Sequence, residues 1–510
     1  MYISTRGNHA PVTASQAIYL GMVPEGGLFV PEQIPHLTLS EITAMEGLNY
    51  PKLAAEILKL YLDDYSETEL QECADKAYGK NFFNEDIAPV TLLENLGGIL
   101  ELWHGPTAAF KDMALQIMPH LLSKALVKEG SGKQVLILVA TSGDTGKAAL
   151  EGFKNVPGIQ IVVFYPHQGV SKVQELQMST TDGDNTYVVA IKGNFDDCQD
   201  GVKRIFGDQE MARELSLRKQ QLSSANSINW GRLAPQIVYY FYSYLSMTEA
   251  GCIEMGEPLN FVVPTGNFGN ILAAWYAKSM GLPIGKLICA SNTNKVLTDF
   301  FETGIYDRNR PFYKTQSPSM DILISSNLER FLFEMTGHDG TLINAWMDEL
   351  NQTGKFQVDA ALLAKMREIL WAGAADEAEA AAQTRNVFKT YGYVLDPHTA
   401  VGAAVYEQYK QATGDETLSI LDATASPFKF CKSVMEALGD EKAPEELDEL
   451  QILEALSGYA GIPVHPALEG LDHREVHHTK VAEKNEMKNL VKSILDGTYS
   501  KQPSSMIMDI

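Results

Sequence analysis

The chain has 510 residues, and its 41 basic and 65 acidic residues give a formal net charge of −24. This charge argues against nucleic acid or an anionic membrane as a partner, because both need a basic face. A small anionic ligand is not excluded, since it needs only a local cluster of donors. The composition, with 45% hydrophobic and 21% charged residues, is that of an ordinary globular protein.

The cysteines and the apolar runs predict where the chain resides. The five cysteines form no CxxC pair, which predicts reduced thiols and a cytoplasmic location. The opening residues contain no apolar run for export, and the most apolar stretch, Val135–Ala140, is too short to cross a membrane. The sequence does not reveal an oligomeric state.

In chain order, the patterns predict three regions. We expect a mainly helical N-terminal segment over residues 1–95, an α/β core over 96–440, and an acidic, helical extension over 441–510 that packs outside the core. Within the core, short apolar runs alternate with helical patterns, which predicts open parallel sheets covered by helices, with ligands at the carboxyl ends of the strands. The expected strands cover residues 98–103, 135–140, 159–165, 187–191, 259–263, 287–290 and 418–422.

Two helices of this core have distinct features. The first follows the strand at 98–103, with Thr107 as its expected N-cap and a kink at Pro119. The second is rich in alanine and is expected over residues 371–390.

The loop Thr265-Gly-Asn-Phe-Gly-Asn270 follows a predicted strand and opens a predicted helix. Glycines let the backbone approach a ligand closely, and a helix N-terminus offers free N–H donors, so the loop is a candidate phosphate site. A plain strand-to-helix turn is the alternative. The loop has neither the GK[ST] of a P-loop nor GxGxxG spacing, which weakens both nucleotide interpretations.

A second loop, Thr141-Ser-Gly-Asp-Thr-Gly146, occupies the same kind of position. Its hydroxyl and N–H groups could hold a carboxylate. Helix capping by Ser142 or Thr145 is the alternative, and the more common use of such residues.

Lys111 opens an apolar segment, where an ammonium group is costly to bury. The side chain either extends to solvent or has a covalent function. A lysine in apolar surroundings together with a separate phosphate loop suggests pyridoxal phosphate, whose aldehyde forms a Schiff base with lysine.

Several motifs together resemble threonine synthase, a pyridoxal-phosphate enzyme of fold type II. They are LWHGPTAAFKDMAL, ATSGDTG, NSINWGRLAPQ, VPTGNFGNI, SNTNKVLTDF and DATASPFKF, and the opening YISTRG…PEGGLFVPE is also similar. The resemblance covers nearly the whole chain. It implies a core of two lobes with the cofactor between them, and the conversion of O-phospho-L-homoserine and water to L-threonine and phosphate.

The resemblance also implies roles for individual residues. Lys111 matches the Schiff-base lysine, and Thr424 matches the hydroxyl that contacts the pyridine nitrogen. The cofactor-phosphate loop corresponds to Gly266, Asn267, Phe268, Gly269 and Asn270. Ser142, Asp144 and Thr145 match the loop that holds the substrate carboxylate, although many fold type II enzymes carry Asn at the position of Asp144. ATASPFKF likewise departs from the family's TAHPAKF form.

The substrate phosphate needs a second anion site. Arg232, in NSINWGRL, is the leading candidate because a guanidinium binds phosphate bidentately, and a structural salt bridge is its alternative. Asn226 and Ser227 could add donors, and Lys172 is a weaker candidate.

Histidines complete the list of candidates. His473, His477 and His478 lack the HExxH order and an evident third ligand, so we expect a solvated helix there and no metal site. His104 is interpreted as a packing or hydrogen-bonding residue.

Two rival functions use the same fold. One is a phosphohomoserine phospho-lyase, or another lyase or dehydratase of fold type II, which differs in how water is placed. The other is a ligand sensor without catalysis, for which the loss of the lysine would be the signature.

Overall fold

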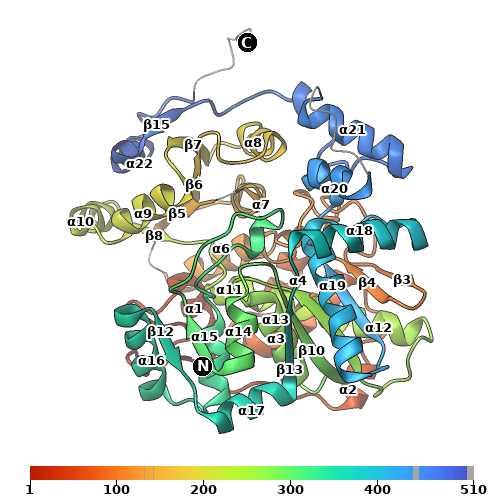
Figure 1. Cartoon of the computed structure of the whole chain (residues 1–510). Coiled ribbons are helices and arrows are strands. Elements are labelled where there is room, and N and C mark those ends of the chain that lie inside the picture. The colour runs from red at the N-terminus through yellow and green to blue at the C-terminus, as the bar shows by residue number, and fades with distance from the viewer. Residues whose placement is uncertain (131, 142, 440–446, 502–510) are drawn as a thin grey trace.

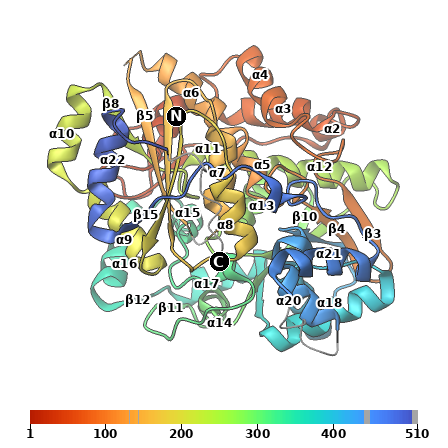
Figure 2. The same ribbon diagram turned by 90° about the horizontal axis from the view of Figure 1, so that it is seen from above.

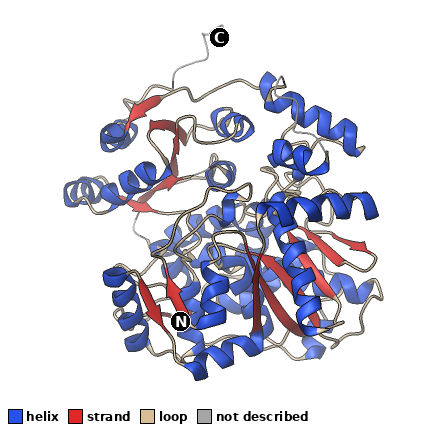
Figure 3. Ribbon diagram, in the orientation of Figure 1, coloured by secondary structure: helices blue, strands red, loops and turns tan. Residues whose placement is uncertain are grey.

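The computed structural model describes residues 1–130, 132–141, 143–439 and 447–501. Two sheets organise it, and Figures 1 and 3 show the smaller one lying above the larger. Figure 2 gives the view from above. No helix in these ranges is long and apolar enough to cross a membrane.

The N-terminal region packs helices around a short strand pair. Its elements are β1 (Tyr2–Ser4), α1 (Ala14–Leu20), β2 (Phe29–Pro31), α2 (Leu39–Thr43), α3 (Tyr50–Tyr61) and α4 (Glu67–Ala77). Helix α1 begins where Thr13 and Gln16 form a capping box, and α4 begins where Ser66 and Glu69 form another. These reciprocal bonds satisfy N–H groups that have no partner within the helix.

The larger sheet has six strands in the order β13-β10-β9-β14-β4-β3. All neighbouring pairs are parallel except β3 with β4. Its strands are β3 (Val90–Leu93), β4 (Gly97–Glu101), β9 (Leu259–Pro264), β10 (Ile284–Ser291), β13 (Leu370–Ala374) and β14 (Ser419–Ala423). The carboxyl ends of the five parallel strands therefore meet at one edge, as the sequence predicts for a ligand site.

Helices and short pairs surround this sheet. They are α11 (Trp230–Leu233), α12 (Pro235–Glu249), α13 (Gly269–Ser279), α14 (Val296–Thr303), β11 (Ile305–Asp307), α15 (Leu328–Met335), α16 (Gly340–Thr353), β12 (Lys355–Gln357), α17 (Ala360–Ile369), α18 (Glu377–Tyr391), α19 (Pro397–Thr413), α20 (Cys431–Leu438) and α21 (Glu449–Ala460). Two 3₁₀ turns, η1 (Pro318–Met320) and η2 (Pro427–Phe430), lie near the same carboxyl edge.

The smaller sheet has five parallel strands in the order β15-β7-β6-β5-β8. Its elements are α5 (Asp112–Leu115), α6 (Met118–Lys128), β5 (Gln134–Ala140), α7 (Asp144–Phe153), β6 (Ile159–Pro166), α8 (Lys172–Ser179), β7 (Thr186–Lys192), α9 (Phe195–Phe206), α10 (Gln209–Leu217), β8 (Gln220–Ser223), β15 (Val481–Glu483) and α22 (Met487–Leu495), with 3₁₀ turns η3 (Leu471–His473) and η4 (Lys484–Glu486). Alternate residues of β5 enter two different cores, since Ile137 packs toward the main core and Leu136 toward α9 and α22.

The fold class expected from the sequence is confirmed: α/β, with two open parallel-sheet units and helical ends. Several local expectations are wrong. The C-terminal extension is not only helical, because β15 extends the smaller sheet. The expected helix over 371–390 begins as strand β13, and the helix itself starts at Glu377.

The helix expected after Thr107 also differs. Lys111 occupies the N-cap position of α5, while the Thr107 hydroxyl and N–H instead donate to Asp112. Pro119 does not kink a continuous helix. It lies in the first turn of α6, where a missing N–H costs nothing, and the helix is interrupted between α5 and α6.

Candidate active site

Lys111 lies next to the end of β14. The segment before it runs antiparallel to the residues after β14: Phe110 N–H donates to the Thr424 carbonyl at 2.8 Å, and Ser426 N–H donates to the Ala108 carbonyl at 3.0 Å. The structure thus brings together Lys111 and Thr424, which the sequence separates by more than three hundred residues.

The Lys111 side chain is half-buried and has no ion-pair partner among the described residues. Its Nζ donates only to Ser319 Oγ, at 3.4 Å. Its pKa is lowered to about 8: burial is the largest cause, the cations of Arg232 and Lys429 act in the same direction, and Asp144 acts against them. A buried amine that loses its proton near neutral pH can act as a nucleophile or as a base.

The loop Gly266–Asn270 joins β9 to α13 and presents unpaired N–H donors. None of its backbone N–H groups has an acceptor among the described residues, although all of it except Asn267 is buried. Phe268 takes the left-handed conformation, with φ of +64°, at the start of α13. Buried N–H groups normally have acceptors, so this loop fits a bound anion such as a phosphate.

Asn270 has a different part in this loop. Its Oδ1 accepts from the Thr265 hydroxyl at 2.6 Å, and its Nδ2 donates to the Pro264 carbonyl at 2.8 Å. The Asn270 side chain therefore fixes the turn, and its backbone N–H has no acceptor among the described residues.

The loop after β5 leads to a negatively charged side chain, that of Asp144. The Asp144 carboxylate is buried at the first position of α7, where Oδ1 lies 3.2 Å from Lys429 Nζ and accepts from Gln174 at 2.9 Å. Burial raises the pKa of Asp144, but Lys429 and Lys111 together outweigh burial and leave it well below its usual range. A carboxylate held ionised in this way repels another carboxylate.

The other polar residues of that loop are Thr141, Ser142 and Thr145. The side chain that caps α7 is Thr141, whose hydroxyl accepts from the N–H groups of Gly143 and Gly146 at 3.0 Å each. Thr145 is half-buried in the first turn of α7. Ser142 lies outside the described residues.

Arg232 is a buried guanidinium without a carboxylate. Its Nη1 donates to the Ala225 carbonyl at 2.6 Å, and no acidic side chain pairs with it among the described residues. Burial lowers its pKa to about 10. The salt bridge that the sequence left open is not formed, so the cation remains available to an anionic ligand.

The other proposed phosphate donors differ in their surroundings. The Ser227 hydroxyl lies 3.1 Å from that of Ser326, which also donates to Asn267, so Ser227 lies near the phosphate loop. Asn226 is exposed. The Lys172 side chain is 58% exposed and pairs with Glu175 on the surface.

Thr424 follows β14 and is 5% exposed. Its backbone is held by Phe110 and Thr399, but its hydroxyl makes no hydrogen bond with the described residues. A free hydroxyl beside Lys111 fits the ring nitrogen that the resemblance assigns to it.

Sequence reasoning missed Lys429, Ser319 and His398. Lys429 is buried on η2, pairs with Asp144, and donates to the Thr107 carbonyl at 2.7 Å. Its signal was the apolar PFKF, which surrounds a lysine much as AAFKDM surrounds Lys111. Ser319 and His398 gave no signal, because only the tertiary fold brings Ser319 to Lys111 and His398 to Ser319.

The remaining histidines lie away from Lys111's contacts. His104 bonds Glu101 at 2.7 Å and stacks on Trp103, as its interpretation predicted. The expected helix over His473–His478 is wrong, because His473 ends a 3₁₀ turn and the following residues have no regular secondary structure. The described residues contain no group of three or more metal-ligating side chains.

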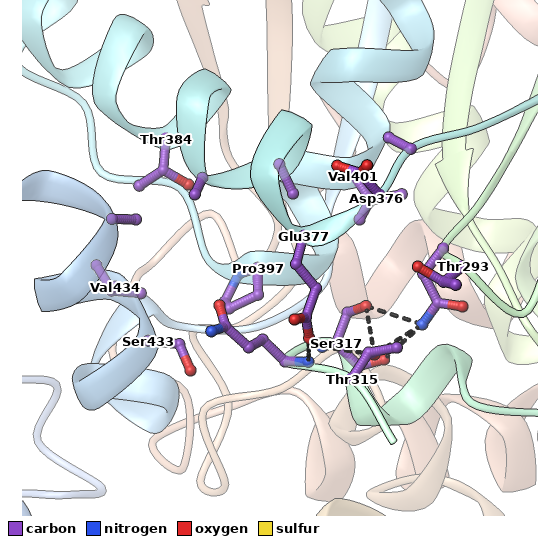
Figure 4. Close-up of a pocket in the computed structure, with 16 residues that line it drawn as sticks. Thr293, Thr315, Ser317, Asp376, Glu377, Thr384, Pro397, Val401, Ser433 and Val434 are labelled. Atoms are coloured by element: carbon purple, nitrogen blue, oxygen red, sulfur yellow. Dashed lines mark hydrogen bonds between the residues drawn. The ribbon is translucent and has the colours of Figure 1, made fainter. Parts of the chain in front are cut away.

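A pocket lies beside Ser317, the residue that precedes η1. Figure 4 shows Thr315, Ser317, Glu377 and Pro397 around it, from the loop before η1 and from α18 and α19. It contains none of the candidate site residues named above.

Known families match the chain in three parts. Residues 99–421 match the family described as pyridoxal-phosphate dependent enzyme, residues 1–78 match "Threonine synthase N terminus", and residues 399–493 match "Threonine synthase, C-terminal". The fold and the lysine beside an anion loop thus define a pyridoxal-phosphate dependent enzyme of fold type II.

Individual relatives narrow this class. Threonine synthase of Pseudomonas aeruginosa is 38% identical over 447 residues, which cover 87% of this chain and 91% of that protein. A crystal structure of threonine synthase from yeast is 33% identical, has a TM-score of 0.86, and is matched over 97% of this chain and 99% of that chain. The chain belongs to the threonine synthase family.

Two further matches bear on cofactor and length. The crystal structure of "PLP bound" threonine synthase from Brucella melitensis is 34% identical, with a TM-score of 0.85 over 98% of this chain and 99% of that one. The expected cofactor, pyridoxal phosphate, is thereby confirmed for the family. Human "Threonine synthase-like 1" is 42% identical over 465 residues, which cover 89% of this chain but 62% of that protein.

Proposed function

We propose that this chain converts O-phospho-L-homoserine and water to L-threonine and phosphate. One observation carries the proposal: two anion sites that have no acidic partner among the described residues, the Gly266–Asn270 N–H groups and the Arg232 guanidinium, lie around the half-buried Lys111. The cofactor and this substrate each bring a phosphate. A dehydratase substrate brings no second phosphate, so Arg232 favours a phosphorylated amino acid.

Different residues would hold different parts of the cofactor. Gly266, Asn267, Phe268, Gly269 and Asn270 would bind its phosphate through backbone N–H groups, and Thr424 would meet its ring nitrogen. When bound, the cofactor supplies an aldehyde that condenses with amines and a ring that withdraws electrons from the adjacent carbon. Since Thr424 is a neutral hydroxyl, it would not hold the ring nitrogen protonated as a carboxylate would.

Lys111 is the proposed catalytic residue. Its amine would join the cofactor at rest and, once freed by the substrate amine, take and return protons on neighbouring carbons. Proton transfer by a positioned group contributes about 10²–10⁴-fold to a rate. Burial favours this role, because it keeps the pKa of the amine near 8.

The substrate's two anionic groups would be bound separately. Arg232 would bind its phosphate, and the loop of Ser142 and Thr145 at the start of α7 would bind its carboxylate. Asp144 was grouped with these two residues, but its ionised state makes a direct carboxylate contact unfavourable. We assign Asp144 instead to the charge balance around Lys111.

A product assay tests this function and its rival. Wild-type protein with pyridoxal phosphate and phosphohomoserine should release phosphate and threonine in equal amounts. Release of phosphate with 2-oxobutyrate would favour the phospho-lyase, and the absence of both products would refute the proposal.

The Lys111→Ala variant is the matched test of the residue. We expect activity to fall by at least about 10³-fold, because both the covalent anchor and the proton carrier are lost. Lys124→Met, which removes a lysine from the surface pair with Glu72, is the control. Borohydride should attach the cofactor to wild-type Lys111. Residual attachment in the variant would count against Lys111 as the residue that joins the cofactor.

The remaining assignments are proposals as well. We propose a cytoplasmic location, which the five free cysteines support. We also propose the division into segments 1–95, 96–440 and 441–510.

A further inference from the structure

The turn η1 lies between Lys111 and the phosphate loop. The Ser319 hydroxyl accepts from Lys111 Nζ at 3.4 Å and donates to Asp144 Oδ2 at 3.3 Å. The missing Cβ of Gly266 would lie 3.1 Å from the Ser319 carbonyl oxygen and 3.2 Å from Met320 Cα. The position of this one turn therefore affects both the amine and the loop.

Two anchors hold the turn. On the pocket side, drawn in Figure 4, the Asn292 amide donates to Ser317 Oγ at 2.9 Å and to Asp321 Oδ1 at 2.8 Å. On the other side, the Ser319 N–H donates to His398 Nε2 at 3.1 Å. The first anchor bonds to the residues on either side of the turn, Ser317 and Asp321. The second bonds to Ser319 itself.

The hydrogen bonds determine the tautomer of His398. An N–H group can only donate, so the Nε2 that receives it carries no proton. Nδ1 then bears the proton and donates to Asp396 Oδ1 at 2.8 Å. His398 is 2% exposed and packs against the Phe430 ring, with centroids 4.9 Å apart, so the imidazole has little freedom to turn.

Capping of α19 does not require the imidazole. Asp396 is the N-cap residue, and its carboxylate accepts from the backbone N–H groups of His398 and Thr399. The Thr399 hydroxyl also donates to Asp396. These bonds do not involve the imidazole, whose own contributions are the bonds to Asp396 and Ser319 and the contact with Phe430.

We propose that His398 is a positioning residue for the reaction: its neutral Nε2 fixes Ser319, and through Ser319 it fixes the Lys111 amine beside Asp144. The inference rests on the proposed function and adds to it a residue that acts through another. Among the described residues His398 has no hydrogen bond to the Lys111 amine or to Arg232, the proposed ligand of the substrate phosphate, so we expect its effect on the rate more than on substrate binding.

Two amide substitutions separate the two ends of the imidazole. In His398→Asn the side-chain amide can reach Asp396 but not Ser319. In His398→Gln the longer side chain can place Oε1 where Nε2 lies, so the acceptor is restored. We expect kcat to fall about tenfold in the Asn variant with KM changed by less than about twofold, and Gln to recover most of kcat.

A second readout does not depend on turnover. Without cofactor, Lys111 should be methylated by formaldehyde and borohydride roughly three- to tenfold faster in His398→Asn than in wild type, since Ser319 no longer holds the amine. The Gln variant should react like wild type. Peptide mass spectrometry measures this rate, and urea unfolding verifies that the variants are folded.

The outcomes are distinct. Equal kcat and equal methylation in wild type and the Asn variant would overturn the inference, and so would equal losses in Asn and Gln. If wild type makes no threonine, the proposed function fails. The methylation rates then still decide whether His398 positions Lys111.

Discussion

The surroundings of Lys111 differ on two sides. The donor side, Gly266–Asn270 with Arg232, presents N–H groups and a cation with no acidic partner among the described residues. The paired side, Asp144 with Lys429 and Gln174, contains an anion already matched by a cation and an amide. On the paired side, the charged groups are matched without a ligand. On the donor side, the N–H groups and the cation have no acidic partner among the described residues.

This difference indicates where ligand anions bind. Buried donors without acceptors cost free energy, and a chain of charge −24 has few cations to leave unused. A phosphate bound on the donor side, as we propose, would supply the missing acceptors. On the paired side, a further anion would have to compete with Asp144 for Lys429.

The largest effect should come from breaking the paired side. Lys429→Met leaves the Asp144 carboxylate buried without its cation, since the two side chains are 0% and 5% exposed. We expect the free energy of unfolding to fall by about 3 kcal/mol at pH 7, measured by urea titration. Removing the charge on both partners, in Lys429→Met with Asp144→Asn, should restore at least half of the loss.

The pH dependence of this effect has a definite sign. The pKa of Asp144 is lowered in the folded state, so its contribution is present above the usual carboxyl pKa and disappears as the pH falls through the strongly acidic range. The difference between wild type and Lys429→Met should therefore shrink at acid pH. A difference that stays constant would mean that Lys429 acts by packing and not by charge.

On the donor side, Arg232→Met should raise the KM for phosphohomoserine by roughly ten- to a hundredfold, since charge-assisted bonds to a phosphate are lost. Inhibition by inorganic phosphate should weaken in parallel. Lys172→Met, at an exposed surface position, is the matched control and should change neither value. If cofactor affinity fell and KM did not, Arg232 would belong to the cofactor phosphate and not to the substrate.

A smaller effect should follow from crowding the donor side with one methyl group. In Gly266→Ala the new Cβ lies 3.1 Å from a backbone oxygen of η1, whereas in Gly269→Ala the nearest atom is 3.5 Å away. We expect Gly266→Ala to weaken pyridoxal phosphate binding about tenfold and Gly269→Ala to leave it nearly unchanged. Fluorescence titration measures both, and equal losses would show that the loop is not held against η1.

The donor side could be largely predicted from the sequence, and the paired side could not. The residues of TGNFGN are consecutive in the chain, after a strand and before a helix, so local rules suffice to predict a loop of free N–H groups. Asp144 and Lys429 are brought together only by the tertiary fold. The sequence therefore grouped Asp144 with its neighbours Ser142 and Thr145.

The same limit applies to the elements. Strands with continuous apolar runs, such as β5 and β9, were predicted because burial on both faces leaves a clear pattern. β15 has three residues and β13 begins an alanine-rich stretch, so pairing with a neighbouring strand, not composition, determines their structure. The helix expected at His473–His478 failed for a related reason: the backbone there bonds to Ser179 instead of to itself.

The smallest effect concerns the proton on Lys111, which both sides influence. With a pKa of about 8, the neutral amine should become about fivefold more abundant from pH 7 to pH 8, so methylation of the cofactor-free protein should rise by that factor and level off above pH 9. Lys124, whose pKa the bond to Glu72 raises, should still be gaining reactivity there.

Both cations should shift this midpoint in the same direction. Arg232 and Lys429 each lower the pKa of Lys111, so Arg232→Met and Lys429→Met should both move the midpoint of methylation upward. Asp144→Asn should move it downward, because Asp144 is the charge that favours the protonated amine. A midpoint that responded to Lys429 but not to Arg232 would place the donor side too far from Lys111 to share a substrate with it.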